Sequence, residues 1–116
     1  MYKRQLLVVA VEPAESAVLS GGETGSHNIE GTGIGYEPPL WDADRIDEII
    51  PVSTIEAKAM ARRLAREEAI FAGTSSGANV VAALNVAEKH GPEVTIVTLI
   101  VDTGLKYLST DLYQES

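Results

Sequence analysis

Two short, uninterrupted apolar runs limit the folds open to this chain. Residues 6–11 read LLVVAV and residues 96–101 read IVTLIV, with Thr98 as the single polar residue. Such runs are typical of strands covered on both faces of a parallel sheet. Both are far shorter than the roughly 20 apolar residues that a membrane-spanning helix needs. We therefore predict one strand at 6–11, ended by Glu12-Pro13, and a second at 95–101.

The stretch between the two runs contains signals for loop, strand and helix. Residues 14–42 are rich in Gly, Ser, Glu and Pro, which predicts loop with at most a short helix. Residues 49–52 form a short strand candidate. Ser53 followed by Glu56 is a capping box, in which the serine hydroxyl and the glutamate carboxylate satisfy the free groups of a first turn. A helix is therefore predicted to begin there.

The predicted first helix is amphipathic. Its apolar residues recur at i, i+3, i+4 and i+7, which places them on one face: Ala57, Met60, Ala61 and Leu64. The charged residues Lys58, Arg62, Arg63, Arg66 and Glu67 are expected to face solvent. We expect this helix to lie on the surface of the sheet.

The second predicted helix covers residues 78–87. It is apolar on nearly every face, which is typical of a buried helix, and Gly91-Pro92 supplies a stop signal. The order strand, helix, helix, strand predicts an α/β fold.

Composition excludes several kinds of function. Hydrophobic residues make up 45% of the chain and charged residues 22%, as in folded globular proteins. The net charge of −8 disfavours nucleic acid and anionic membranes as partners. There is no cysteine, so disulfides, thiolate metal sites and a cysteine nucleophile are excluded within these residues.

Three turns are candidates for a ligand site. In open parallel sheets ligands bind beyond the carboxyl ends of the strands, and turns beginning at Gly31, Gly73 and Asp102 fit that position. The Gly31–Gly35 run, GTGIG, lacks the spacing of the dinucleotide fingerprint, which leaves either a flexible turn or a close backbone approach to a ligand. The two serines of the Gly73–Ala78 turn, GTSSGA, can either cap a helix or contact a ligand.

The histidines do not indicate a catalytic or metal site. His27 lies in a loop and His90 at a helix end, and neither has the spacing of a serine triad or of metal ligands. We expect both to be ordinary surface residues.

Four segments together resemble a known family. They are VAVEP at 9–13, EGTGIGY at 30–36, GTSSGA at 73–78 and DTGLKYLST at 102–110. In order and spacing they are similar to the cysteine synthase and cystathionine β-synthase family, the fold-type II enzymes that use pyridoxal phosphate. The resemblance implies part of a three-layer αβα parallel-sheet domain, like that of the tryptophan synthase β subunit.

The resemblance also implies the roles of five residues. Ser75 matches the serine whose hydroxyl meets the pyridine nitrogen of pyridoxal phosphate, and a neutral hydroxyl makes the ring a milder electron sink than a carboxylate would. Gly31 and Gly33 match the glycine loop beside the cofactor, which closes on the substrate amino acid. Asp102 and Thr103 match the turn near the ring nitrogen.

The implied reaction is a β-replacement that makes cysteine from an activated serine, such as O-acetylserine, and a sulfur donor. The implied full-length enzyme is a cytoplasmic homodimer. Val101, where the family commonly has proline, and Leu105-Lys106, where it has Glu-Arg, leave the sulfur donor open. A serine or threonine dehydratase and a non-catalytic binding module remain as alternatives.

The family's covalent lysine, substrate-carboxylate loop and phosphate loop have no counterpart here. None of the four lysines occupies a matching position: Lys3, Lys58, Lys89 and Lys106. We therefore expect residues 6–116 to be the C-terminal part of the enzyme domain, inactive alone and exposing apolar sheet surface. Residues 1–5, MYKRQ, are expected to be a non-native leader.

Overall fold

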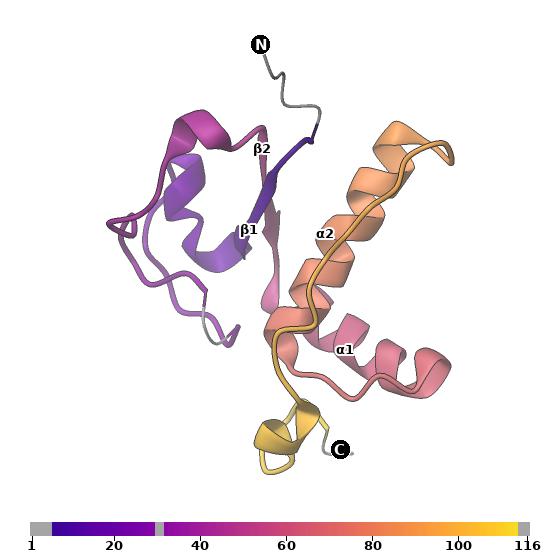
Figure 1. Cartoon of the computed structure of the whole chain (residues 1–116). Coiled ribbons are helices and arrows are strands. Elements are labelled where there is room, and N and C mark those ends of the chain that lie inside the picture. Colours follow the sequence, from indigo (N-terminus) through magenta and orange to yellow (C-terminus); the bar gives the residue numbers. More distant parts are fainter. Residues whose placement is uncertain (1–5, 30–31, 114–116) are drawn as a thin grey trace.

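Two parallel strands and two helices form the framework of residues 6–29 and 32–113, the part of the chain that the computed structural model describes (Figure 1). The predicted leader, residues 1–5, and Gly31 lie outside these residues. The main elements are β1 (Val9–Pro13), β2 (Glu48–Val52), α1 (Thr54–Glu68) and α2 (Thr74–His90). Short 3-10 helices are η1 (Ala14–Ser16), η2 (Val18–Ser20), η3 (Ala43–Arg45) and η4 (Gly104–Tyr107).

Strand β1 begins and ends later in the sequence than predicted. It pairs with β2 in parallel, from Val9 opposite Glu48 to Pro13 opposite Val52, so that Glu12-Pro13 belongs to the strand. Just before the two strands begin, the Asp47 side chain accepts a hydrogen bond from the Val8 amide at 2.7 Å. The apolar residues before Val8 have no neighbouring strand in the described part of the chain, and Leu6 and Leu7 are exposed.

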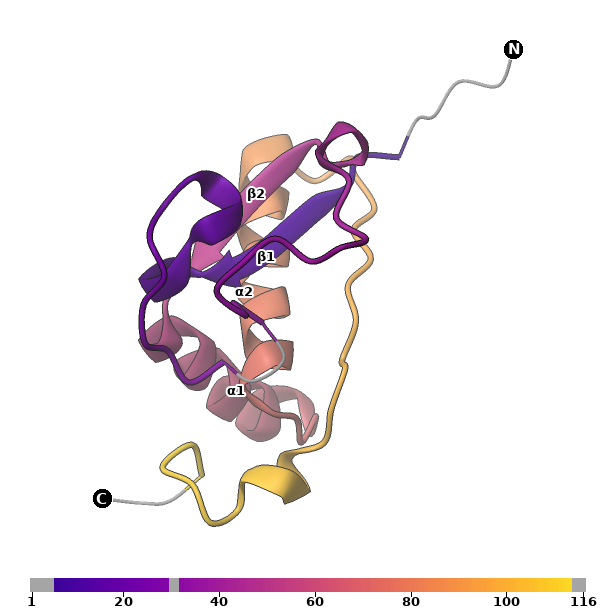
Figure 2. The ribbon, with the colours of Figure 1, turned by 90° about the vertical axis from the view of Figure 1, so that its left-hand side faces the viewer.

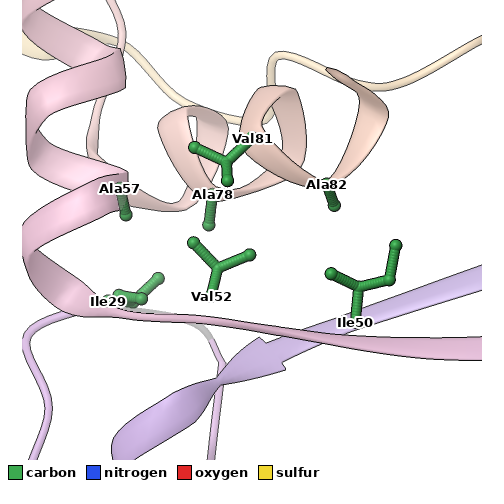
Figure 3. Close-up of a cluster of buried hydrophobic side chains, with 7 residues drawn as sticks. All are labelled: Ile29, Ile50, Val52, Ala57, Ala78, Val81 and Ala82. Carbon is green, nitrogen blue, oxygen red and sulfur yellow. The ribbon is translucent and has the colours of Figure 1, made fainter. Parts of the chain in front are cut away.

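The sheet lies between an irregular layer and the helices. Residues 14–47 cover one face with loop and short 3-10 helices, and α2 covers the other (Figures 1 and 2). Figure 3 shows the core between β2 and α2, in which Ile50 and Val52 point toward the small side chains of the helix. This cluster comprises Ile29, Ile50, Val52, Ala57, Ala78, Val81 and Ala82. The prediction of an α/β fold with a parallel sheet is confirmed.

Helix α1 begins where the capping box predicts. The Ser53 hydroxyl accepts from the Glu56 amide at 3.1 Å, and the Glu56 carboxylate in turn accepts from that hydroxyl at 3.0 Å. The predicted position on the sheet surface is wrong, because α1 packs mainly against α2. Gly77 of α2 permits this packing, since a Cβ there would lie 2.1 Å from the Ala57 carbonyl oxygen.

Helix α2 is buried all round only in its first turn. Its buried residues are Thr74–Ala78, Val81 and Ala82, whereas Leu84 is exposed. The prediction of burial on nearly every face is therefore wrong for the later turns, which lack a partner on each face among the described residues.

Residues 95–101 do not form the predicted second strand. They run as extended chain beside α2 (Figure 1), held by a bond from the Asn79 side chain to the Leu99 carbonyl and one from the Val101 amide to Ser76 Oγ. Within the described residues only β1 and β2 pair as strands, so the sheet does not reach this segment. Val97 is 85% exposed, and the predicted exposure of apolar surface is confirmed.

Residues 107–113 are held against α1 by hydrogen bonds and an ion pair. Arg62 donates from Nε to the Leu112 carbonyl at 2.6 Å and from Nη2 to the Asp111 carbonyl at 2.9 Å. Lys58 binds the Asp111 carboxylate at 2.7 Å with a side chain only 12% exposed. The prediction that Lys58 and Arg62 face solvent is wrong, because the returning chain covers this side of α1. None of the described helices has the length and apolar character to cross a membrane.

Substituting Arg62 tests this attachment. Arg62→Ala leaves two carbonyl acceptors without their charged donor, so we expect a loss of about 1.5–3 kcal/mol in the free energy of unfolding. Urea denaturation measures the loss, and Arg66→Ala, at an exposed position of the same helix, is the control. Equal stability of the two variants would show that the bonds of Arg62 contribute nothing.

Candidate functional site

The N-terminus of α2 is capped from a distant part of the chain. Its N-cap residue, Gly73, has no side chain, and no side-chain cap comes from within the turn itself. Asp102 instead accepts through Oδ1 from the Gly73 amide at 2.9 Å and from Ser76 Oγ at 2.6 Å. The simple alternative, in which one of the two serines caps the helix, is therefore wrong.

Ser75 joins this cluster through the other carboxylate oxygen. Its hydroxyl donates to Asp102 Oδ2 at 3.3 Å, and the residue is 8% exposed. A hydroxyl that donates to a carboxylate keeps its lone pairs for a further partner. The predicted pair Ser75 and Asp102 is thus brought together across 27 residues of sequence.

Glycines allow the two segments to approach so closely. A Cβ on Gly73 would lie 2.2 Å from Asp102 Oδ2 and equally near a ring carbon of Tyr107. Gly104 donates its amide to the Phe71 carbonyl at 3.0 Å and lies flat against the Phe71 ring. The turn 102–104 therefore fits onto residues 71–76 only because these two positions lack a side chain.

Gly33 lies in a second group, with Pro13 and His27. It has a positive φ of +54°, and a Cβ there would lie 2.5 Å from Pro13 Cγ and 2.6 Å from His27 Nε2. His27 Nε2 is 2.9 Å from the Gly33 carbonyl oxygen. His27 is half-buried, and its position in a loop gave no signal of this contact.

A cleft of about 480 Å³ lies between His27 and the start of α2. His27 borders it on one side, and Thr74, the residue before Ser75, borders it on the other. Its lining consists of His27, Asn28, Lys58, Thr74, Tyr107, Thr110, Asp111 and Leu112. The hydrogen bond from Lys58 lowers the pKa of the Asp111 carboxyl below its ordinary value.

Among the described site residues, Thr103 does not join the cluster. Thr103 is exposed and caps η4, where its Oγ1 accepts from the Leu105 amide at 3.4 Å. Gly31 lies outside the described residues. Within residues 6–29 and 32–113 no group of His, Asp and Glu side chains is arranged to hold a metal ion.

Comparison with known proteins identifies relatives of this chain. The model of the family described as "Pyridoxal-phosphate dependent enzyme" matches residues 2–102. A Bacillus subtilis protein named "Probable cysteine synthase" is 47% identical over 108 residues, which are 93% of this chain and 35% of that protein. The chain thus spans about a third of the length of such relatives.

Solved structures show the same likeness. The crystal structure of a cysteine synthase from Entamoeba histolytica matches with a TM-score of 0.91 and 44% identity, over 98% of this chain and 34% of that one. An O-acetylserine-dependent cystathionine β-synthase from Helicobacter pylori matches with a TM-score of 0.84 and 36% identity, over 94% and 35%. The predicted fold class is confirmed by both.

Proposed function

Because the chain belongs to the family of pyridoxal-phosphate-dependent enzymes, we propose that it forms the C-terminal third of a cysteine synthase. The reaction makes cysteine from an activated serine, such as O-acetylserine, and a sulfur donor. The observation that carries the proposal is the nearly buried Ser75 hydroxyl, held by Asp102 at the start of α2. The cysteine synthase names of the relatives favour this reaction over the dehydratase alternative.

The chemistry of this cluster fits the ring end of the cofactor. A helix N-terminus ordinarily attracts phosphate, but here the Asp102 carboxylate accepts from the Gly73 amide at the start of α2 and would repel a second anion. A neutral hydroxyl instead suits an aromatic nitrogen, because it can turn its proton from the carboxylate toward that nitrogen. Ser75 would therefore hold the ring nitrogen, and the phosphate would be held elsewhere.

Each residue then has a defined task. Bound pyridoxal phosphate supplies an electron sink that lets the leaving group depart from the β-carbon of the substrate. Ser75 would hold the ring by donating its hydroxyl proton to the ring nitrogen, and Asp102 keeps the Ser75 side chain in position. Gly31 and Gly33 let the backbone approach the bound substrate, and Thr103 supports the turn that carries Asp102.

Two features support the view that further chain completes the enzyme. The exposed apolar segment 94–101 is extended but unpaired within the described residues, as a strand awaiting its neighbours would be. Lys58 and Lys89 are held in ion pairs with Asp111 and Glu48, and neither adjoins Ser75. The covalent lysine would therefore come from the completing part, in a cytoplasmic homodimer.

A chimera tests the proposed function. Residues 6–113 replace the matching third of the Bacillus subtilis relative, and purified protein is assayed with O-acetylserine and sulfide. We expect cysteine formation by the chimera and none by the 116-residue chain alone. A folded chimera that binds the cofactor but releases a 2-oxo acid would support the dehydratase. Activity of the isolated chain would contradict the proposal that the covalent lysine comes from the completing part of the enzyme.

A further inference from the structure

Both ring nitrogens of His27 are engaged by the backbone on either side of residues 30–31. The Ile29 amide lies 3.1 Å from Nδ1, and the Gly33 carbonyl oxygen lies 2.9 Å from Nε2. A backbone amide can only donate and a carbonyl can only accept. Nδ1 must therefore be the acceptor and Nε2 must carry the proton, which defines a neutral imidazole in one tautomer.

Ile29, the backbone partner of Nδ1, is fixed in the core. Ile29 is 1% exposed and packs in the cluster formed with Val52, Ala57 and Ala78 (Figure 3). Its carbonyl also accepts from Thr32 Oγ1 at 2.7 Å. The imidazole thus connects a rigid point of the core to Gly33, the glycine with a positive φ.

The Gly33 end leaves no room for an alternative position. An added Cβ would collide with both the Pro13 ring and the His27 ring, so the backbone at Gly33 lies directly against two rings. Pro13 belongs to β1, which is itself paired along its whole length with β2. Within the described residues, the imidazole supplies the hydrogen bond that fixes the Gly33 carbonyl in direction as well as in distance.

From this geometry we propose that His27 is a positioning residue, which as a neutral Nε2–H imidazole holds Gly33 in place for substrate binding. The role of His27 in substrate binding rests on the proposed function. The two hydrogen bonds of His27 to Ile29 and Gly33, called the clasp below, do not. Protonation of Nδ1 removes the acceptor for the Ile29 amide and puts two donors face to face. Loss of the imidazole should likewise release the Ile29 amide and the Gly33 carbonyl.

Three charged groups face His27 from the surrounding elements. Glu15 lies next to it on η1. Although burial opposes the shift, hydrogen bonds from Thr54 lower the pKa of Glu15. Asp111 and Lys58 line the same cleft as His27.

Nuclear magnetic resonance on the 116-residue chain tests the tautomer without cofactor or substrate. Long-range ¹H–¹⁵N spectra at neutral pH should show an unprotonated Nδ1 and a protonated Nε2 for His27. Hydrogen exchange of the Ile29 amide should be roughly tenfold faster in His27→Phe than in the unchanged chain. A Nδ1–H tautomer, or equal Ile29 exchange in the two chains, would overturn the proposal.

Variants separate positioning from stability. His27→Asn can keep the acceptor for Ile29 but cannot reach Gly33, and His27→Phe removes both bonds while keeping a ring. His90→Asn, at the exposed end of α2, is the matched control. In an active chimera we expect His27→Asn to raise KM for O-acetylserine roughly tenfold, with a smaller change in kcat. Reduced stability with unchanged KM would refute the positioning role.

If the chimera makes no cysteine, the proposed function fails, but the tautomer and exchange measurements on the chain still decide whether the clasp exists. If the chimera is active and the tautomer is the opposite one, the proposed function stands and the clasp is wrong.

Discussion

Replacing Ser75 with aspartate should lower cysteine formation by the chimeric enzyme roughly 100-fold, an effect of the size seen when one preorganised partner of a reacting group is lost. The introduced carboxylate would lie beside that of Asp102, which is 3.3 Å from the present hydroxyl. Two such carboxylates cannot both ionise without cost. A carboxylate at this position would also hold a proton on the ring nitrogen and make the ring a stronger electron sink, which favours side reactions.

Two further variants isolate the cause of this loss. Ser75→Ala removes the hydroxyl without adding charge and should be less damaging than the aspartate. Ser109→Asp adds the same charge at an exposed position and should be neutral. Turnover and the yellow absorption band of the bound cofactor are measured together. If Ser75→Asp leaves both unchanged, Ser75 does not contact the cofactor ring.

Substituting Gly77 with alanine should lower the free energy of unfolding by about 2 kcal/mol. The added Cβ would lie 2.1 Å from the Ala57 carbonyl oxygen and 3.0 Å from the Ala61 amide nitrogen. Because these atoms are backbone, α1 must move away from α2 as a whole. The gain of about 1 kcal/mol in helix propensity is smaller than the cost of this separation.

Urea denaturation measures this effect, and Asn85→Ala provides the control at an exposed position of α2. The control gains helix propensity without a clash and should be slightly stabilised. If Gly77→Ala is as stable as Asn85→Ala, the two helices are not in the close contact described here.

The sequence was most informative where the deciding interactions span a few residues. The capping box at Ser53 and Glu56 predicts the start of α1 correctly, because both of its hydrogen bonds lie within one turn. The turn from Gly73 and the resemblance of its serines to a cofactor site likewise depend on local motifs. The α/β class follows from the order of apolar runs and amphipathic segments.

Interactions between distant residues decided the rest. Residues 95–101 have the composition of a strand, but a strand also needs a neighbour to pair with, and none of the described residues provides one. Nothing local links Ser75 to Asp102 or His27 to Gly33.

The sequence by itself determined which segments can be helix or strand, and which motifs the family supplies. Only the tertiary structure decided which carboxylate holds the Ser75 hydroxyl and which nitrogen of His27 carries a proton. The physical reason is that propensity and capping act over one turn of chain. Hydrogen-bond direction at a site depends on the groups that folding brings alongside.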